Sequence, residues 1–217
     1  MKNFEKKYSV SHETFLNLQT YLSLLMEWQK RFNLVSQSSL EEAWNRHFMD
    51  SVQLLKFVPE NAKSLVDFGS GAGFPGMVLA IIFKEKTPYL KTTLVESIKK
   101  KTMYLKEVAE KTQTDVEILN KRIEEIKNRK YDVITSRAMT SLEKLLSYAK
   151  PFCKKETVCI FPKGKNYAEE LAEAHKKWQF ECRIEASEQS SEGKILIISN
   201  IKKKEKKDAK NLSDRQS

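Results

Sequence analysis

The residues best suited to chemistry lie in one stretch, 64–82, which reads SLVDFGSGAGFPGMVLAII. A short apolar run ends in Asp67, and three glycines then follow at alternate positions: Gly69, Gly71 and Gly73. Glycine suits positions where the backbone takes a positive φ or approaches a ligand, because it carries no Cβ. The stretch therefore predicts a strand, a tight turn and a helix with Pro75 in its first turn. Such a turn leaves backbone N–H groups open to a nucleotide-like ligand.

Two classes of ligand fit this turn. Residues 71–76 match the dinucleotide pattern G-x-G-x-x-G. Residues 67–73 match the D-x-G-x-G-x-G turn of S-adenosylmethionine (AdoMet) methyltransferases. An acid at Asp67 would repel a diphosphate, whereas it suits the amino group and sulfonium of AdoMet. The turn therefore favours AdoMet, with an NAD(P)-dependent oxidoreductase as the alternative and a plain strand-to-helix turn as the simplest interpretation.

A second carboxylate lies where a nucleoside needs one. Residues 90–96 predict the next strand, which ends in Glu96. An acid at this point can accept hydrogen bonds from ribose hydroxyls. Both cofactor classes use such an acid, so Glu96 supports a nucleoside ligand without choosing between them.

Composition and charge suggest a polyanionic partner. The chain has 217 residues, 40% of them hydrophobic, and a formal net charge of +10. Residues 202–217 hold seven basic and three acidic side chains and so contribute +4, which leaves +6 on the body. A basic body favours nucleic acid as a partner, although solvated surface lysines would give the same total.

The sequence also points to a compartment. No apolar run approaches the ~18 residues of a membrane span, and the first residues lead into charge, unlike a signal peptide. Three cysteines form no C-x-x-C, and three scattered histidines give no metal-ligand spacing. We therefore expect a reduced, cytoplasmic protein with no metal and no membrane association. Nothing in the sequence demands a dimer, so we expect a monomer.

Hydrophobic periodicity organises the chain around the turn. Helices are expected over 11–32 and 39–57, the second with Ser39 and Glu42 at capping-box spacing, and residues 1–10 are expected to be loose. After the turn, strands and helices alternate, which indicates an α/β fold. The expected later strands are 90–96, 116–119, 131–136, 157–161, 180–186 and 194–201. The last two are adjacent along the chain, so we expect an antiparallel hairpin at the sheet edge.

This pattern predicts three regions: an N-terminal helical cap (1–60), an AdoMet-binding core (61–201) and a basic disordered tail (202–217). In the cap, His47 and Asp50 stand three residues apart on a predicted helix. They are either a buried polar pair that anchors the cap or part of a pocket wall.

Five segments together resemble one family. They are RHFMDS (46–51), VDFGSGAGFPG (66–76), LVES (94–97), RIEE (122–125) and TSRA (135–138). In this order they resemble the RsmG (GidB) family, bacterial methyltransferases of small-subunit ribosomal RNA. The resemblance implies a class I AdoMet-dependent methyltransferase fold, Rossmann-like, with a seven-stranded sheet whose last pair is antiparallel. It implies AdoMet as donor and N7 of one guanine in a decoding-region loop of 16S rRNA as acceptor, within a small-subunit particle.

The family pattern also suggests site residues. Its cofactor positions match Gly69, Phe74, Ile123, Glu124 and Arg137, although the family commonly has Leu where Phe74 stands and Asp where Glu96 stands. With the turn, the expected cofactor site comprises Asp67, Gly69, Ser70, Gly71, Gly73, Phe74, Glu96, Ile123, Glu124 and Arg137. The expected substrate contacts are Arg137, Lys163 and Lys165. Arg137 would bind the methionine carboxylate or an RNA phosphate, unless it forms a surface ion pair.

The chemistry implied needs no acid–base catalyst. Guanine N7 has a free lone pair and no proton to lose. The fourth expected strand ends in Ser136-Arg137, not in the N-P-P-Y-type loop of exocyclic amino methylation, and no Pro-Cys dipeptide is present. The rate would come from positioning, which can supply ~7–11 kcal/mol. An AdoMet-dependent methyltransferase of another RNA or of a small molecule remains the alternative.

Overall fold

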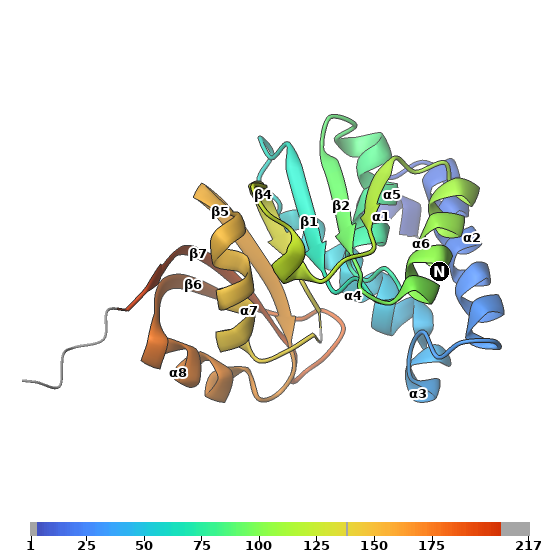
Figure 1. Cartoon of the computed structure of the whole chain (residues 1–217). Helices are drawn as coiled ribbons and strands as arrows, with labels where there is room; N and C mark the ends of the chain where they lie inside the picture. The colour runs from blue at the N-terminus through green and yellow to red at the C-terminus, as the bar shows by residue number, and fades with distance from the viewer. Residues whose placement is uncertain (1–3, 138, 205–217) are drawn as a thin grey trace, which may run out of the picture.

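The computed structural model describes residues 4–137 and 139–204, and its centre is one seven-stranded sheet. The strands are β1 (Ser64–Phe68), β2 (Lys91–Val95), β3 (Val116–Leu119), β4 (Tyr131–Thr135), β5 (Cys153–Lys163), β6 (Trp178–Ala186) and β7 (Lys194–Lys203). Their spatial order is β3-β2-β1-β4-β5-β7-β6 (Figure 1). β1 to β5 are parallel, while β7 runs antiparallel to both β5 and β6. The predicted α/β fold with an antiparallel last pair is confirmed.

Helices precede the sheet and connect its strands. The α-helices are α1 (Phe4–Tyr8), α2 (His12–Gln29), α3 (Gln37–Leu40), α4 (Asp50–Val52), α5 (Gly76–Lys86), α6 (Lys99–Lys111), α7 (Leu142–Ala149) and α8 (Tyr167–Lys177). A π-helical segment, η1 (Trp44–Met49), and three 3-10 segments, η2 (Gln53–Phe57), η3 (Ile123–Glu125) and η4 (Lys150–Phe152), complete the described elements. No helix among the described residues is long and apolar enough to cross a membrane.

Alternating side chains of β1 face two different layers. Leu65 packs in a cluster with residues of η2 and α5, such as Leu54 and Leu79. Val66, next along the strand, packs with residues of α7 such as Leu146. This period of two is the expected behaviour of a strand that is buried on both faces.

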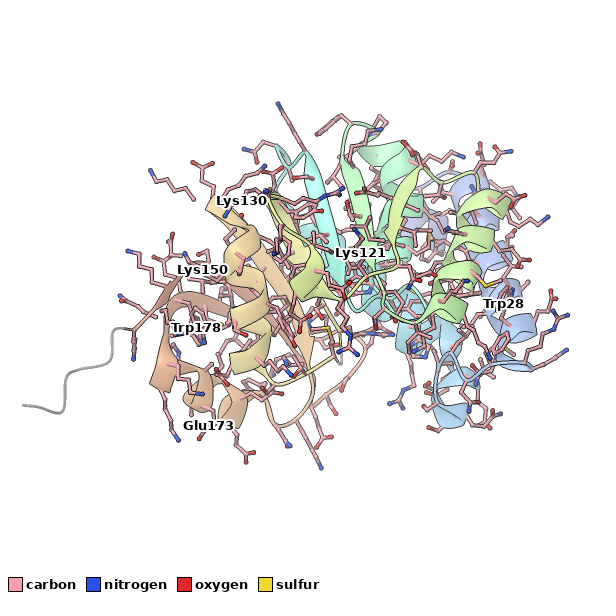
Figure 2. The ribbon with its side chains drawn as sticks, viewed as in Figure 1. Trp28, Lys121, Lys130, Lys150, Glu173 and Trp178 are labelled. Carbon is pink, nitrogen blue, oxygen red and sulfur yellow. The ribbon has the colours of Figure 1, made fainter. Side chains whose placement is uncertain are left out.

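The cap lies at one side of the sheet. α2 contacts both α5 and α6, and Figure 2 shows Trp28 at this side and Trp178 at the other, near α8. The indole of Trp28 donates a hydrogen bond to Glu107 of α6 (2.9 Å). The cap helices share one hydrophobic cluster with α5 and α6, so cap and core are packed through a common interior.

Two local predictions for the cap were wrong. Residues 4–8 were expected to be loose, yet they form α1, because the buried ring of Phe4 packs against Phe15 and Trp44 (centroids 5.7 and 5.4 Å apart). The single helix expected over 39–57 is instead divided into α3, η1, α4 and η2, and its first N-cap is Ser36 rather than Ser39. Ser39 is buried and hydrogen-bonded to His47, a tertiary contact that replaces the expected cap.

Several element boundaries also differ from expectation. β5 covers Cys153–Lys163 where the strand was expected over 157–161, and β6 begins at Trp178, two residues before its expected start. Pro75 is the N-cap residue of α5 and lies just before its first turn. Lys202 and Lys203, assigned to the tail from sequence, belong to β7, while residues 205–217 lie outside the described part of the chain.

Candidate active site

The turn between β1 and α5 has the backbone that its glycines predicted. All three glycines have positive φ: Gly69 (64°), Gly71 (58°) and Gly73 (96°). Residues with a Cβ rarely adopt such angles. The backbone N–H of Ser70 donates to the carbonyl of Val95 at the end of β2 (3.0 Å), which fixes the turn to the neighbouring strand.

The cap holds this turn from the other side. The hydroxyl of Tyr21 in α2 donates a hydrogen bond to the carbonyl of Ala72 (2.5 Å). A Cβ on Gly73 would lie 2.3 Å from that hydroxyl, so only glycine lets Tyr21 come so close. Tyr21 is fully buried and its ring stacks on Phe74 (centroids 5.3 Å apart).

Asp67 lies beneath the turn and holds it together. Its carboxylate accepts hydrogen bonds from the hydroxyl of Thr135 (2.9 Å) and the backbone N–H of Gly76 (3.3 Å). The side chain is fully buried, and this desolvation raises the pKa of Asp67 to about 6. Its surroundings make Asp67 a residue that shapes the turn.

Glu96 connects the turn to the start of α6. One carboxylate oxygen accepts from the backbone N–H of Gly71 (2.9 Å) and the other from that of Ile98 (2.8 Å). A carboxylate offers about four acceptor positions, so two remain for a ligand hydroxyl.

A first cavity of about 420 Å³ opens beside Glu96. Five of the predicted cofactor residues line it: Gly69, Gly71, Glu96, Ile123 and Glu124. Basic residues around it are Lys101, Lys121, Arg122 and Lys144. Figure 2 labels Lys121, which follows β3, close to the centre of the molecule. Tyr148 lines it as well, and the pKa of Glu124 is lowered by hydrogen bonds from its own backbone N–H and from the Tyr148 hydroxyl.

The other predicted cofactor residues lie outside this lining. Asp67, Ser70, Gly73 and Phe74 are buried behind the turn or against the cap. The hydroxyl of Ser70 donates to the carbonyl of Asp67 (3.1 Å). The ring of Phe74 packs among Tyr21, His47 and Phe48. These residues support the shape of the cavity, and direct contact of any of them with a cofactor stays a prediction.

Arg137 reaches from the end of β4 to the cap. Its guanidinium donates to the carbonyl of Arg46 (2.9 Å), to the carboxylate of Asp50 (3.2 Å) and to Nδ1 of His47 (2.8 Å). It also lies over the ring of Phe74, 5.1 Å from the centroid. His47 and Asp50, which were expected to pair with each other or to form a pocket wall, are joined through this guanidinium.

These residues line a second cavity of about 820 Å³. Its walls come from the cap (Arg46, His47, Asp50), from the segment after β4 (Arg137, Met139, Thr140) and from the β6–β7 side (Ser187, Ser190, Lys194). Burial together with the charges of Arg137 and Arg46 lowers the pKa of His47 to about 4. The imidazole is therefore neutral at physiological pH and can accept the Arg137 hydrogen bond at Nδ1.

The predicted phosphate contacts differ in their surroundings. Lys163 lines the second cavity, but its amine is bonded to Glu170 (2.7 Å) and to the carbonyl of Thr140 (2.9 Å). Lys165 is exposed and lies outside the linings of both cavities. A role of either lysine in substrate binding stays a prediction.

Sequence reasoning missed several residues that shape the site. Tyr21 belongs to no motif within the helix expected over 11–32, and Met139 and Thr140 follow the TSRA segment without a motif of their own. Met139 and Thr140 line both cavities and so form the wall that the two share. Position alone gave a signal for them, since residues just after a parallel strand lie at the ligand-binding edge of the sheet.

The first cavity suits AdoMet. A Cβ on Gly71 would meet nothing nearer than the Gly69 carbonyl at 3.8 Å, so the bare turn faces open space. Glu96 has acceptor capacity for ribose hydroxyls, and the nearby cations suit the methionine carboxylate. Among the described residues, no group of three or more His, Cys, Asp and Glu side chains is placed to hold a metal ion.

The comparison with known families decides the class of protein. Residues 15–198 match the GidB family model, described as rRNA small subunit methyltransferase G. The chain belongs to this family. Two relatives named ribosomal RNA small subunit methyltransferase G come from Parvibaculum lavamentivorans (38% identical; 92% of this chain and 89% of that protein) and Jannaschia sp. (40%; 86% and 89%). The resemblance to the RsmG (GidB) family is confirmed.

A solved structure supports the same fold. A mutant of MtNAS in complex with S-adenosylmethionine is 14% identical, with a TM-score of 0.56 over 85% of this chain and 74% of that one. Membership of the GidB family together with this class I fold confirms AdoMet as the cofactor and methyl transfer as the activity.

Proposed function

We propose that this GidB-family protein transfers the methyl group of AdoMet to N7 of one guanine in a decoding-region loop of 16S rRNA. AdoMet, bound in the first cavity, supplies an electrophilic methyl group on a sulfonium. The residues of the chain bind and orient the two reactants. In this proposal the protein acts as a monomer in the cytoplasm on a small-subunit particle.

The choice of N7 is supported by the hydrogen bonds of the side chains that could act as a general base. Three side chains that line the second cavity could accept a proton: His47, Asp50 and Glu170. Each already accepts a hydrogen bond from a cation, His47 and Asp50 from Arg137 and Glu170 from Lys163. Such engaged acceptors suit a nucleophile that has a free lone pair and needs no general base, as guanine N7 does.

Residues that line the first cavity are assigned to AdoMet binding. Glu96 would accept hydrogen bonds from the ribose hydroxyls, since two of its four acceptor positions are free. Gly69 and Gly71 would let the backbone approach the methionine part, and Ile123 would pack on the adenine. Arg137 is assigned to the acceptor side, because its guanidinium lines the second cavity.

Labelled methyl incorporation tests this proposal. The protein is incubated with methyl-labelled AdoMet and with 30S particles or free 16S rRNA that lack the modification. We expect label in one guanine and strand cleavage there after reduction and aniline treatment, which detects N7-methylguanine. Label on another RNA class or on a small molecule would replace the proposed substrate, and label on a different atom would refute N7.

A further inference from the structure

The second cavity adjoins the first through a wall of two residues. Met139 and Thr140 line both cavities, while each cavity has its own residues beyond that wall. An in-line displacement requires the nucleophile to approach the donor methyl from the side opposite the sulfur. A nucleophile held in the second cavity at Met139 and Thr140 would be adjacent to a donor held in the first. The volume of about 820 Å³ lies in the range of ligand pockets.

The charge of this cavity favours an anion. Four cations line it, Arg46, Arg137, Lys163 and Lys194, against the two carboxylates of Asp50 and Glu170. Both carboxylates are already paired, Asp50 with Arg137 and Glu170 with Lys163. Arg46 and Lys194 have no ion pair within residues 4–137 and 139–204, and they come from different walls, the cap and β7.

We propose that the second cavity receives one nucleotide of the acceptor RNA, with the guanine at the Met139–Thr140 wall and the adjoining phosphates on Arg46 and Lys194. The inference rests on the proposed function and adds to it the place and the contacts of the acceptor. It makes the cap and the start of β7 parts of the RNA site, in addition to the segment after β4.

The polar groups of the β6–β7 loop fit this assignment. Ser187 and Ser190 line the cavity, and the Ser190 hydroxyl accepts from the backbone N–H of Gly193 (3.0 Å), which leaves its own O–H to donate. A hydroxyl in this position suits a ribose or phosphate oxygen. An unpaired base in a loop can leave its stack and enter a pocket, and phosphate contacts offset the lost stacking.

Two single substitutions test the inference, Arg46→Ala and Lys194→Ala. Lys155→Ala is the matched control, because Lys155 is an exposed lysine of β5 outside both cavity linings. The measurements are binding of 16S rRNA at several salt concentrations, KM for 30S particles, and AdoMet affinity by calorimetry.

Each cavity variant should raise KM for particles about 5- to 20-fold and leave AdoMet affinity within about 2-fold. Each should also reduce the slope of log affinity against log salt by roughly 0.7 to 0.9, the amount expected for one lost phosphate contact. The control should change none of these by more than about 2-fold.

The inference would be overturned if both cavity variants matched Lys155→Ala in KM and in salt slope while wild-type protein methylated the particles. Failure of the wild-type protein to methylate any RNA is a different result. It would refute the proposed function, and the inference that depends on it would fall with it.

Discussion

The hydroxyl of Tyr21 donates its hydrogen bond to the carbonyl of Ala72, 51 residues further along the chain. The bond joins the middle of the cap helix α2 to the glycine turn that faces the first cavity. It is possible only because Gly73 has no Cβ in the space that the Tyr21 hydroxyl occupies. The cap is thus part of the structure that shapes the first cavity.

Removal of this hydroxyl should weaken cofactor binding. Tyr21→Phe leaves the buried carbonyl of Ala72 without its donor, at a cost of about 1–3 kcal/mol. This cost destabilises the turn that faces the first cavity. We therefore expect AdoMet affinity to fall about 5- to 50-fold in calorimetric titrations. Tyr104→Phe is the control, because the buried hydroxyl of Tyr104 has no hydrogen-bond partner among residues 4–137 and 139–204, and its loss should be neutral or stabilising. Equal AdoMet affinity in the two variants would show that the cap does not support the turn.

The carboxylate of Glu96 should be needed for the same site. A glutamine at position 96 can accept from only one of the two N–H groups, of Gly71 and Ile98, and turns an amide donor toward the other. The variant would also lose hydrogen bonds to the ribose hydroxyls. Because of both losses, Glu96→Gln should weaken AdoMet binding at least about 10-fold. Glu110→Gln, an exposed change on α6, should have no effect. Tight AdoMet binding by Glu96→Gln would remove Glu96 from the cofactor site.

Substitution of Arg137 tests whether its guanidinium contacts the methyl donor, AdoMet, or the methyl acceptor, the RNA. Arg137→Lys keeps a positive charge beside Asp50 but loses the fork that also reaches His47 and the stacking on Phe74. We expect kcat/KM for particles to fall about 10- to 100-fold with AdoMet affinity within about 3-fold.

The same substitution at Arg129, which pairs with Glu117 away from both cavities, provides the control and should change neither value. A loss of AdoMet affinity above about 10-fold, with KM for particles unchanged, would instead place the Arg137 guanidinium on the donor.

Asp67 should make stability depend on pH in a defined direction. Its pKa is raised to about 6 in the folded protein from 3.8. The folded state therefore binds this proton more tightly than the unfolded state, so its contribution is greatest below the unfolded pKa and is lost as pH rises through the folded pKa. The Asp67→Asn variant, which cannot titrate at this position, is the reference.

The unfolding free energy of wild type minus that of Asp67→Asn should fall by about 2 kcal/mol between about pH 4.5 and about pH 7.5. Denaturant titrations at several pH values measure this difference, and any constant offset from the lost hydrogen bonds cancels. A difference that stays flat or rises with pH would show that Asp67 is not destabilised by burial.

Local sequence patterns were enough to predict the turn and the strands that surround the first cavity. Three glycines at alternate positions indicated a turn with positive φ, and the structure has positive φ at each of them. Strand and helix periodicity, which depends on neighbours two to four residues apart, predicted the alternating sheet. Glu96 was predicted to accept from ribose hydroxyls because it ends the strand expected over 90–96, and in the structure it lies just after β2 and lines the first cavity.

The remaining features depend on contacts between distant segments. Spacing placed Asp67 near the turn, but its burial under the turn depends on pairing of β1 with β4 and on the hydroxyl of Thr135. The contacts of Arg137 with His47 and Asp50 span about 90 residues, and no local pattern encodes them. The breaks in the expected second cap helix likewise accompany tertiary contacts, such as that between Ser39 and His47.

Mapping the methyl group in ribosomal RNA tests the proposed transfer to guanine N7 most directly. Unmodified 30S particles are treated with labelled AdoMet and the protein, and the 16S rRNA is digested and sequenced by mass. We predict one added methyl group, on N7 of a single guanine in a decoding-region loop, and a large loss of this product with the Glu96→Gln variant. A methyl group on another atom or base, or none on any RNA in particles or free, would contradict the account.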